Sequence, residues 1–294
     1  MSYAEIFRRQ SRPLVPIPTG ETPVLGELAG IRAVLFDVYG TLVVSGSGEV
    51  GTTKSAACSS ALAGAFQAVG IAAAEAVGQG VELLDRSINA SHAESRKAGI
   101  DYPEVDIVAI WRQVLAQLTR RRLIEPSHGG AVDPKRLSVE YEVRANPCWP
   151  MPNVEQCLAE LRGRGLMLGI VSNAQFYTPE MIKALLGGPP EIWGFPADLQ
   201  FFSYRYGRAK PGTALLQVAA EALRRAGISP AEALYVGNDM LNDIFPAAKV
   251  GLRTALFAGD RRSLRRREDV RELAGISPDL VLTDLVQLPG CIII

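Results

Sequence analysis

The chain has 294 residues, of which 48% are hydrophobic and 21% are charged, and its 31 basic residues balance its 31 acidic ones. This length allows one or two domains with a sizeable core, and the zero net charge gives no overall field that would attract nucleic acid or an anionic membrane. No apolar run reaches the roughly 18 residues that cross a bilayer, and the first ten residues lack the apolar stretch of a secretory signal. We therefore expect a cytoplasmic protein that binds neither nucleic acid nor membranes.

Residues 1–30 carry four prolines and show no clear hydrophobic period, so they are expected to form an extended N-terminal arm without a catalytic role. The segment 33–44, AVLFDVYGTLVV, then begins as an apolar run and places one carboxylate, Asp37, where the run ends. Such a run is typical of a strand buried on both faces of a parallel sheet. Ligands bind at the carboxyl ends of such strands, so Asp37 is expected to have a chemical role.

Residues 50–145 are expected to form a separate helical domain. A connector rich in Gly and Ser, 44–53, leads into Ala-rich sequence whose apolar residues recur at helical spacing from about residue 55 to 123, and a further helix is predicted over 134–143. Strand and helix signals alternate again from residue 146 to the C-terminus, which predicts right-handed βαβ crossovers. The fold expected for 31–49 with 146–294 is therefore an α/β domain, a Rossmann-like doubly wound parallel sheet.

Polar groups follow four of the predicted strands. Because parallel strands end at one edge of a sheet, these groups should converge on one crevice. A carboxylate can act as a nucleophile, a hydroxyl and an amide can hold the oxygens of an anion, and a lysine can neutralise developing charge. Further carboxylates suit Mg²⁺, which prefers oxygen ligands. The groups are Asp37, then Ser172 with Asn173, then Lys210, and then Asn238 and Asp239 with Asp243.

This ordered set resembles the motifs of the haloacid dehalogenase (HAD) superfamily of hydrolases. The resemblance covers about residues 31–45 and 146–288, and the helical insertion lies where that superfamily places a type-1 cap. It implies that Asp37 is the nucleophile of a covalent aspartyl intermediate, that Lys210 neutralises charge, and that three residues position the substrate group: Thr41, Ser172 and Asn173. It also implies a small, anionic substrate and a Mg²⁺ ion held by Asp37, the backbone carbonyl of Tyr39, Asn238, Asp239 and Asp243.

Two departures from the family pattern bear on the reaction. Phosphatases of the superfamily usually carry an aspartate two residues after the nucleophile as general acid and base, and this chain has Tyr39 there. The pattern Asp-x-Tyr-Gly-Thr is similar to the 2-haloacid dehalogenases, whose halide needs no proton to leave. The loop GNDMLND, however, resembles the phosphatase metal loop, with Asn238 where an aspartate is usual. Because three carboxylates would repel one another without a cation, we favour Mg²⁺-dependent hydrolysis of a phosphate ester.

Alternatives remain open at this stage. The chain could be a metal-independent 2-haloacid dehalogenase, with Arg112 as a candidate halide receptor, or a binding module on a catalytically degenerate HAD scaffold. Tyr39 could touch the substrate or pack beneath the cap.

In the insertion, six polar or aromatic residues could face the crevice, although surface positions are the default for helix residues. They are His92, Arg96, Lys97, Tyr102, Glu104 and Trp111. The arginine runs 120–122 and 261–267 lack interleaved aromatic residues and are expected to be solvated.

The cysteines and histidines give no sign of a separate metal site. Four cysteines show no metal-ligand spacing, so reduced thiols are expected, and two histidines, His92 and His128, are too few for a histidine-rich site.

Overall fold

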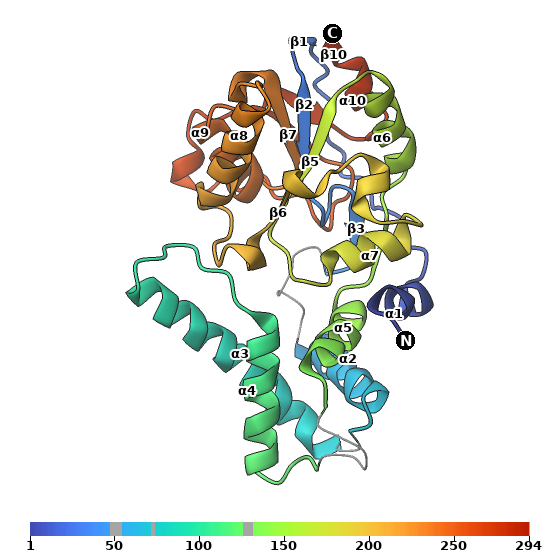
Figure 1. Ribbon diagram of the computed structural model, residues 1–294, viewed down its shortest axis with the longest axis vertical. Coiled ribbons are helices and arrows are strands. Elements are labelled where there is room, and N and C mark those ends of the chain that lie inside the picture. Colours follow the sequence, from blue (N-terminus) through green and yellow to red (C-terminus); the bar gives the residue numbers. More distant parts are fainter. Residues whose placement is uncertain (48–54, 72–73, 126–131, 294) are drawn as a thin grey trace.

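The computed structural model describes residues 1–47, 55–71, 74–125 and 132–293, and it divides into an α/β domain and a helical domain (Figure 1). Most of the predicted connector at 44–53 and the second histidine, His128, lie outside the described residues. The α/β domain contains both ends of the chain, and the helical domain extends from the edge at which the parallel strands end. This arrangement allows the two domains to share one crevice.

The α/β domain is built on a six-stranded parallel sheet with the strand order β6-β5-β2-β7-β8-β9. In order along the chain, the strands are the third, second, first, fourth, fifth and sixth, which is a doubly wound topology. The predicted fold class is confirmed. The strands are β2 (Ala33–Phe36), β5 (Met167–Ser172), β6 (Gln200–Phe202), β7 (Ala233–Gly237), β8 (Arg253–Phe257) and β9 (Leu280–Leu282).

Strand β2 is buried on both faces, because successive side chains point to opposite sides of a strand. Val34 and Phe36 join a core that includes side chains of α6 (Val154–Gly163) and α7 (Thr178–Leu185). Ala33 and Leu35 join the opposite core, formed with α8 (Ala214–Arg225) and α9 (Phe245–Lys249). Covered on both faces, the sheet leaves its edges and strand ends for binding.

The N-terminal arm is not wholly extended, which corrects the expectation for residues 1–30. It begins with α1 (Tyr3–Gln10), whose N-terminus is stabilised by a capping box. The Ser2 hydroxyl accepts from the Glu5 backbone, and the Glu5 carboxylate accepts from the Ser2 backbone at 2.6 Å. Ile6 and Phe7 are buried in the core, with Phe7 against Tyr177 at a ring-centroid distance of 6.2 Å. The helix is too short for its apolar period to stand out in the sequence.

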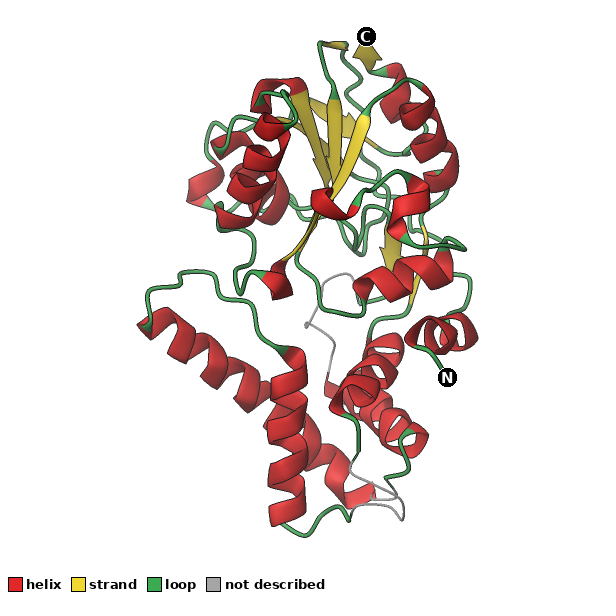
Figure 2. Ribbon diagram, in the orientation of Figure 1, coloured by secondary structure: helices red, strands yellow, loops and turns green. Residues whose placement is uncertain are grey.

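Within the described residues, the helical domain has four helices: α2 (Ser55–Ala68), α3 (Ala74–Lys97), α4 (Ile107–Arg120) and α5 (Pro134–Ala145) (Figure 2). Asp106 and Asp133 are the N-cap residues of α4 and α5, and their carboxylates accept hydrogen bonds from backbone N–H groups of the first turn. A separate apolar core surrounds the fully buried Trp111. The tryptophan predicted as a possible crevice residue is therefore a structural residue of the cap.

Two antiparallel strands, β3 (Val43–Ser45) and β4 (Cys148–Pro150), connect the domains. A buried polar network holds them together: Ser45 donates to Asn146 at 2.7 Å, and Asn146 and Tyr177 donate to Glu142 at 3.2 and 3.0 Å. Burial raises the pKa of Glu142. These bonds lie where the chain passes between the two domains.

The remaining elements are short. The outer pair β1 (Leu28–Ala29) and β10 (Ile292–Ile293) is parallel, and α10 (Gln287–Gly290) precedes β10. Met240–Ile244 forms a π-helical turn that leads into α9. None of the described helices is long and apolar enough to cross a membrane. The 3₁₀ turns are Pro190–Trp193, Ala197–Leu199, Ser203–Arg205, Pro230–Glu232 and Arg271–Leu273.

Replacing Phe7 by Ala tests whether α1 belongs to the core. Truncating a buried phenylalanine costs about 3–5 kcal/mol, so the Phe7→Ala variant should unfold at clearly lower urea concentration than the parent. Arg8→Ala, at an exposed position of the same helix, should change the midpoint little. Equal midpoints for the two variants would mean that the arm contributes nothing to stability.

Candidate active site

The site begins where the order of the strands reverses. Asp37 follows β2 directly, and Asn238 follows the neighbouring strand β7. Ligands of doubly wound sheets bind at this point, because the connections on either side run to opposite faces and leave a crevice. Asp37 and Asn238 are both nearly fully buried, so their polar atoms require partners.

Lys210 supplies the central partner. Its ammonium donates to Asp37 Oδ1 at 2.8 Å and to Asp243 Oδ1 at 2.5 Å, and its side chain is 2% exposed. Burial acts to lower the pKa of Lys210, but the two carboxylates outweigh it and raise that pKa above its usual value. Burial raises the pKa of Asp243 to about 6, although Lys210 opposes the shift. The buried ammonium thus holds the two acids together.

The position of Lys210 is fixed by its neighbours. Asn173, which follows β5, donates from its side chain to the Lys210 carbonyl at 2.9 Å and accepts from the Lys210 backbone at 2.8 Å. The Tyr235 hydroxyl lies 2.8 Å from the ammonium. Asn173 therefore ties the loop that carries Lys210 to the central strands.

A tight turn follows Asp37. Gly40 has φ +82°, and a Cβ at this position would lie 2.5 Å from Ser263 Cβ and 2.9 Å from the Asn238 side chain. Only glycine combines this conformation with so close an approach. Thr41 then donates to Asn238 Oδ1 at 3.1 Å, and Asn238 donates to the Ser263 carbonyl at 2.7 Å.

Asp239 forms an ion pair with Arg267 rather than with Lys210. Arg267 donates to both of its carboxylate oxygens, at 3.1 and 2.7 Å, and Asp239 also caps the π turn by accepting from the Leu241 and Asn242 backbones. The expectation that the run 261–267 is simply solvated is wrong for Arg267 and also for Arg265, which lines the crevice. A contact between positions so far apart along the chain cannot be read from composition.

The Tyr39 hydroxyl contacts the first residue of α7. The hydroxyl pairs with Thr178 Oγ1 at 2.9 Å, and the residue is 8% exposed. Burial, with a contribution from Glu142, raises the pKa of Tyr39 far above its usual range. Tyr39 lines the crevice, but its hydroxyl is held beneath α7.

These groups line a crevice of about 240 Å³ between core and cap. The core contributes Asp37, Tyr39 and Lys210 with their neighbours, and the cap contributes His92, Pro103 and Glu104. Such a volume suits a small molecule. The other lining residues are Asn173, Ala174, Gln175, Ala209, Asn238, Asp239, Asn242, Asp243, Ser263 and Arg265.

Glu104 fastens the cap to the core. Its carboxylate accepts from Ser203 Oγ at 2.6 Å, from Gln175 at 3.0 Å and from the Val105 backbone at 2.9 Å. Backbone hydrogen bonds also join this part of the cap to the loop before Lys210. The Glu104 N–H donates to the Gly207 carbonyl at 3.2 Å, and the Ala209 N–H donates to the Tyr102 carbonyl at 2.8 Å. The cap is therefore docked on the loop that carries Lys210.

Not every predicted residue reaches the crevice. Thr41 and Ser172 are fully buried behind it; Ser172 contacts the Asn173 carbonyl at 3.4 Å. Of the six predicted cap residues, His92 and Glu104 line the crevice, whereas Arg96, Lys97, Tyr102 and Trp111 are not among its lining residues. Arg112 lies in a different hollow, within the cap.

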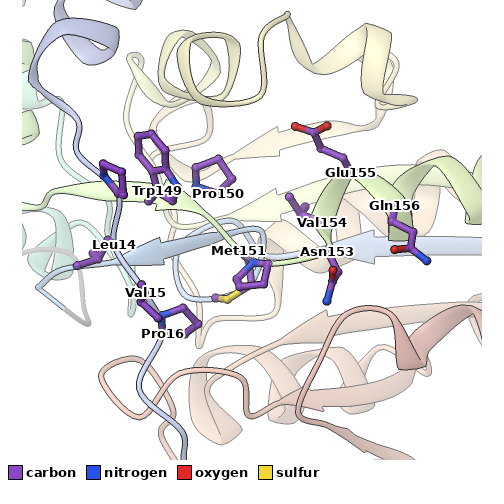
Figure 3. Close-up of a pocket in the computed structure, with 12 residues that line it drawn as sticks. Leu14, Val15, Pro16, Trp149, Pro150, Met151, Asn153, Val154, Glu155 and Gln156 are labelled. Atoms are coloured by element: carbon purple, nitrogen blue, oxygen red, sulfur yellow. The ribbon is translucent and has the colours of Figure 1, made fainter.

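A larger hollow of about 580 Å³ separates the arm from the segment that follows β4. Figure 3 shows its mostly apolar wall, in which Leu14, Val15 and Pro16 pass near Trp149 and Met151. Its described lining contains none of the predicted site residues, which makes the smaller crevice the candidate active site.

Seven lining residues were not predicted from the sequence: Pro103, Ala174, Gln175, Ala209, Asn242, Ser263 and Arg265. Gln175 follows Asn173 closely and could have been found by extending that motif by two residues. Ser263 and Arg265 belong to the arginine-rich run 261–267, which is visible in the sequence. Only the fold brings this run against the loop after β7.

The oxygen donors near Asp37 are of the type that Mg²⁺ prefers. They include the Asp243 carboxylate and the Asn238 amide oxygen, with the backbone carbonyl of Tyr39 in the adjoining turn. No group of three or more His, Cys, Asp or Glu side chains arranged to hold a metal occurs in the described part of the chain. A Mg²⁺ ion would thus be held by a mixed set of ligands and would keep several waters.

Comparisons with known proteins agree with this architecture. A phosphoserine phosphatase from Thermus thermophilus is 29% identical over 200 residues, which cover 68% of this chain and 74% of that protein. A glyceraldehyde 3-phosphate phosphatase from Methanothermobacter thermautotrophicus is 29% identical over 139 residues, 47% of this chain and 57% of that protein.

The solved structures agree at the level of fold. A 2-haloacid dehalogenase from Pseudomonas syringae pv. Tomato DC3000 is 21% identical, with a TM-score of 0.56 over 89% of this chain and 97% of that one. The sequence model of the haloacid dehalogenase-like hydrolases matches residues 31–251, which include the strand ends described above. With the parallel sheet, the strand-end residues and this match in agreement, the chain belongs to the haloacid dehalogenase-like hydrolases.

Proposed function

We propose that this hydrolase cleaves small phosphate monoesters through a covalent intermediate on Asp37. The observation that carries the proposal is the buried ammonium of Lys210, 2.8 Å from Asp37 Oδ1 and 2.5 Å from Asp243 Oδ1. A carboxylate can act as a nucleophile, and a fixed cation beside it balances its negative charge. The two phosphatase relatives, at 29% identity, support phosphate esters rather than haloacids as the substrate class.

In the proposed reaction, an Asp37 oxygen attacks phosphorus and the P–O bond to the alcohol breaks. Water then attacks the aspartyl phosphate, which releases inorganic phosphate and restores the carboxylate. Lys210 stays in place through both steps and balances the charge at Asp37. Asn173 positions Lys210 through its two hydrogen bonds to the lysine backbone.

We propose Mg²⁺ as the cofactor, held by Asp37, the Tyr39 carbonyl and Asn238, with Asp243 close by. The ion would supply positive charge for the phosphoryl oxygens. Asp239 was also predicted as a ligand, but its carboxylate is engaged by Arg267 and by backbone N–H groups. We therefore assign Asp239 the role of shaping the loop.

A metal-independent 2-haloacid dehalogenase is the second candidate, and one observation favours it. Arg267 neutralises Asp239, and Lys210 lies between Asp37 and Asp243, so cationic side chains already face all three acids. The repulsion that argued for a metal is thereby reduced. Against this candidate, the predicted halide receptor Arg112 lies outside the crevice.

Replacing Asp37 by Asn should abolish hydrolysis of p-nitrophenyl phosphate, with a loss of about 10⁴-fold or more in kcat, since the amide is not a nucleophile. Acid-quenched wild-type enzyme should carry a phosphoryl group on the peptide that contains Asp37. Asp198→Asn, at an exposed position, is the matched control. Full activity in the Asp37→Asn variant would exclude the proposed intermediate.

Replacing Lys210 by Met should destabilise the protein by about 3–5 kcal/mol, because it leaves two buried carboxylates without their cation. The double variant Lys210→Met/Asp243→Asn should recover much of that loss in urea unfolding and still be inactive. Lys183→Met changes an exposed lysine and should affect neither property. A stable, active Lys210→Met enzyme would contradict the assigned role.

Removing divalent cations separates the two candidate functions. With EDTA, hydrolysis of phosphate esters should stop and should return with Mg²⁺, because the phosphoryl oxygens lose their counter-charge. The readouts are phosphate release from a panel of phosphorylated metabolites and halide release from 2-chloropropionate. Halide release that EDTA does not affect, without any phosphate release, would select the dehalogenase.

A further inference from the structure

The alcohol that leaves a phosphate monoester needs a proton, because an alkoxide is a poor leaving group. A positioned acid typically contributes about 10²–10⁴-fold to the rate of such a step. The residues that line the crevice include several with dissociable protons. Their hydrogen bonds show which of them is available to donate.

The acidic groups of the core are engaged. The Tyr39 hydroxyl is paired with Thr178 beneath α7. Asp243 accepts from Lys210 and from the Asp239 backbone at 2.9 Å, and Asp239 accepts from Arg267. The protons of Lys210 are shared between carboxylates, and loss of one would leave those acids unbalanced.

Glu104 and Arg265 are equally unsuited. Both carboxylate oxygens of Glu104 are occupied by hydrogen bonds, from Ser203, Gln175 and the Val105 backbone, that hold the cap on the core. These bonds oppose the effect of burial, which raises its pKa. An arginine guanidinium does not give up its proton in proteins.

His92 remains, on α3 in the cap wall of the crevice. It is half-buried, and it is the one histidine in the described part of the chain. The Glu104 contacts hold the neighbouring cap loop against the core, and His92 and Asp37 line the same crevice. Imidazole is the side chain best suited to exchange a proton near neutral pH.

We propose that His92 is the general acid and base of this hydrolase, contributed by the cap to a core whose described residues offer no available proton donor beside Asp37. The assignment rests on the proposed phosphatase function and deepens it. It also implies that the enzyme handles esters of alkyl alcohols, whose leaving groups require protonation.

The proton balance is simple. As Asp37 attacks phosphorus, imidazolium transfers its proton to the bridging oxygen, the P–O bond breaks and the neutral alcohol leaves. Neutral His92 then takes a proton from the water that attacks the aspartyl phosphate. Asp37 and the imidazolium are thereby restored, and no other reactant is needed.

Several charges surround His92. Arg96 lies one turn further along α3, Glu104 comes from the next loop, and the core presents Lys210, Arg265 and the carboxylates of the strand ends. Burial and the Arg96 charge lower the pKa of His92. Protonated His92 is therefore favoured on the acidic side of neutrality. The kcat for alkyl esters should fall as the pH rises above the pKa of His92.

The test compares the dependence of kcat on the leaving group in wild type and His92→Gln. The substrates are p-nitrophenyl phosphate, phenyl phosphate and a primary alkyl phosphate, in order of increasing basicity of the leaving group. In wild type kcat should vary little across the series, because the acid compensates for basicity. In His92→Gln the ratio of alkyl to p-nitrophenyl turnover should fall by about 100-fold or more.

Glu94→Gln, an exposed position two residues further along the same helix, serves as control and should keep the wild-type dependence. An equal loss for all three esters in His92→Gln would assign His92 to binding and overturn the proposal, as would an unchanged series. If wild type fails to turn over p-nitrophenyl phosphate in an Asp37-dependent manner, the proposed function itself fails, and the two failures are thus distinguishable.

Discussion

The buried ammonium of Lys210 is the interaction on which the site depends. It joins Asp37, which follows β2, to Asp243, in the turn after β7, and Asn173, which follows β5, fixes its backbone. Two carboxylates this deep in the protein would each require neutralisation. A single cation shared between them meets that need and leaves Asp37 available for reaction. Three strands are thereby locked at their carboxyl ends, where the sheet topology leaves a crevice.

Electrostatic balance in the crevice is divided between two cations. Lys210 serves Asp37 and Asp243, while Arg267, from the loop after β8, serves Asp239. The division explains how a loop with two aspartates lies beside a third acid without strong repulsion. Pairing the three acids with these cations also reduces the requirement for a metal ion. The neutral amide of Asn238 accepts from Thr41 and donates to the Ser263 carbonyl.

The cap completes the crevice rather than only covering it. Its loop from Tyr102 to Val105 binds the same segment, Ser203 to Ala209, that leads to Lys210. The contacts that dock the cap and the backbone that positions the lysine therefore belong to one loop. The hydrogen-bond network of Ser45, Asn146 and Glu142 lies apart from this contact, where the strands that join the domains pair.

The sequence by itself determined the parallel sheet, the family and the polar residues that end its strands, because buried runs and short motifs are local signals. It did not predict α1, whose eight residues are too few to reveal an apolar period, and it predicted the run 261–267 to be solvated. It also left open whether Tyr39 touches substrate or packs beneath the cap. Only the tertiary structure decided that the Tyr39 hydroxyl pairs with Thr178, 139 positions away, and that Arg267 pairs with Asp239, 28 positions away. It also decided that His92 and Glu104, alone of the six cap candidates, line the crevice. The packing of the two domains, which no local pattern encodes, brings these residues together.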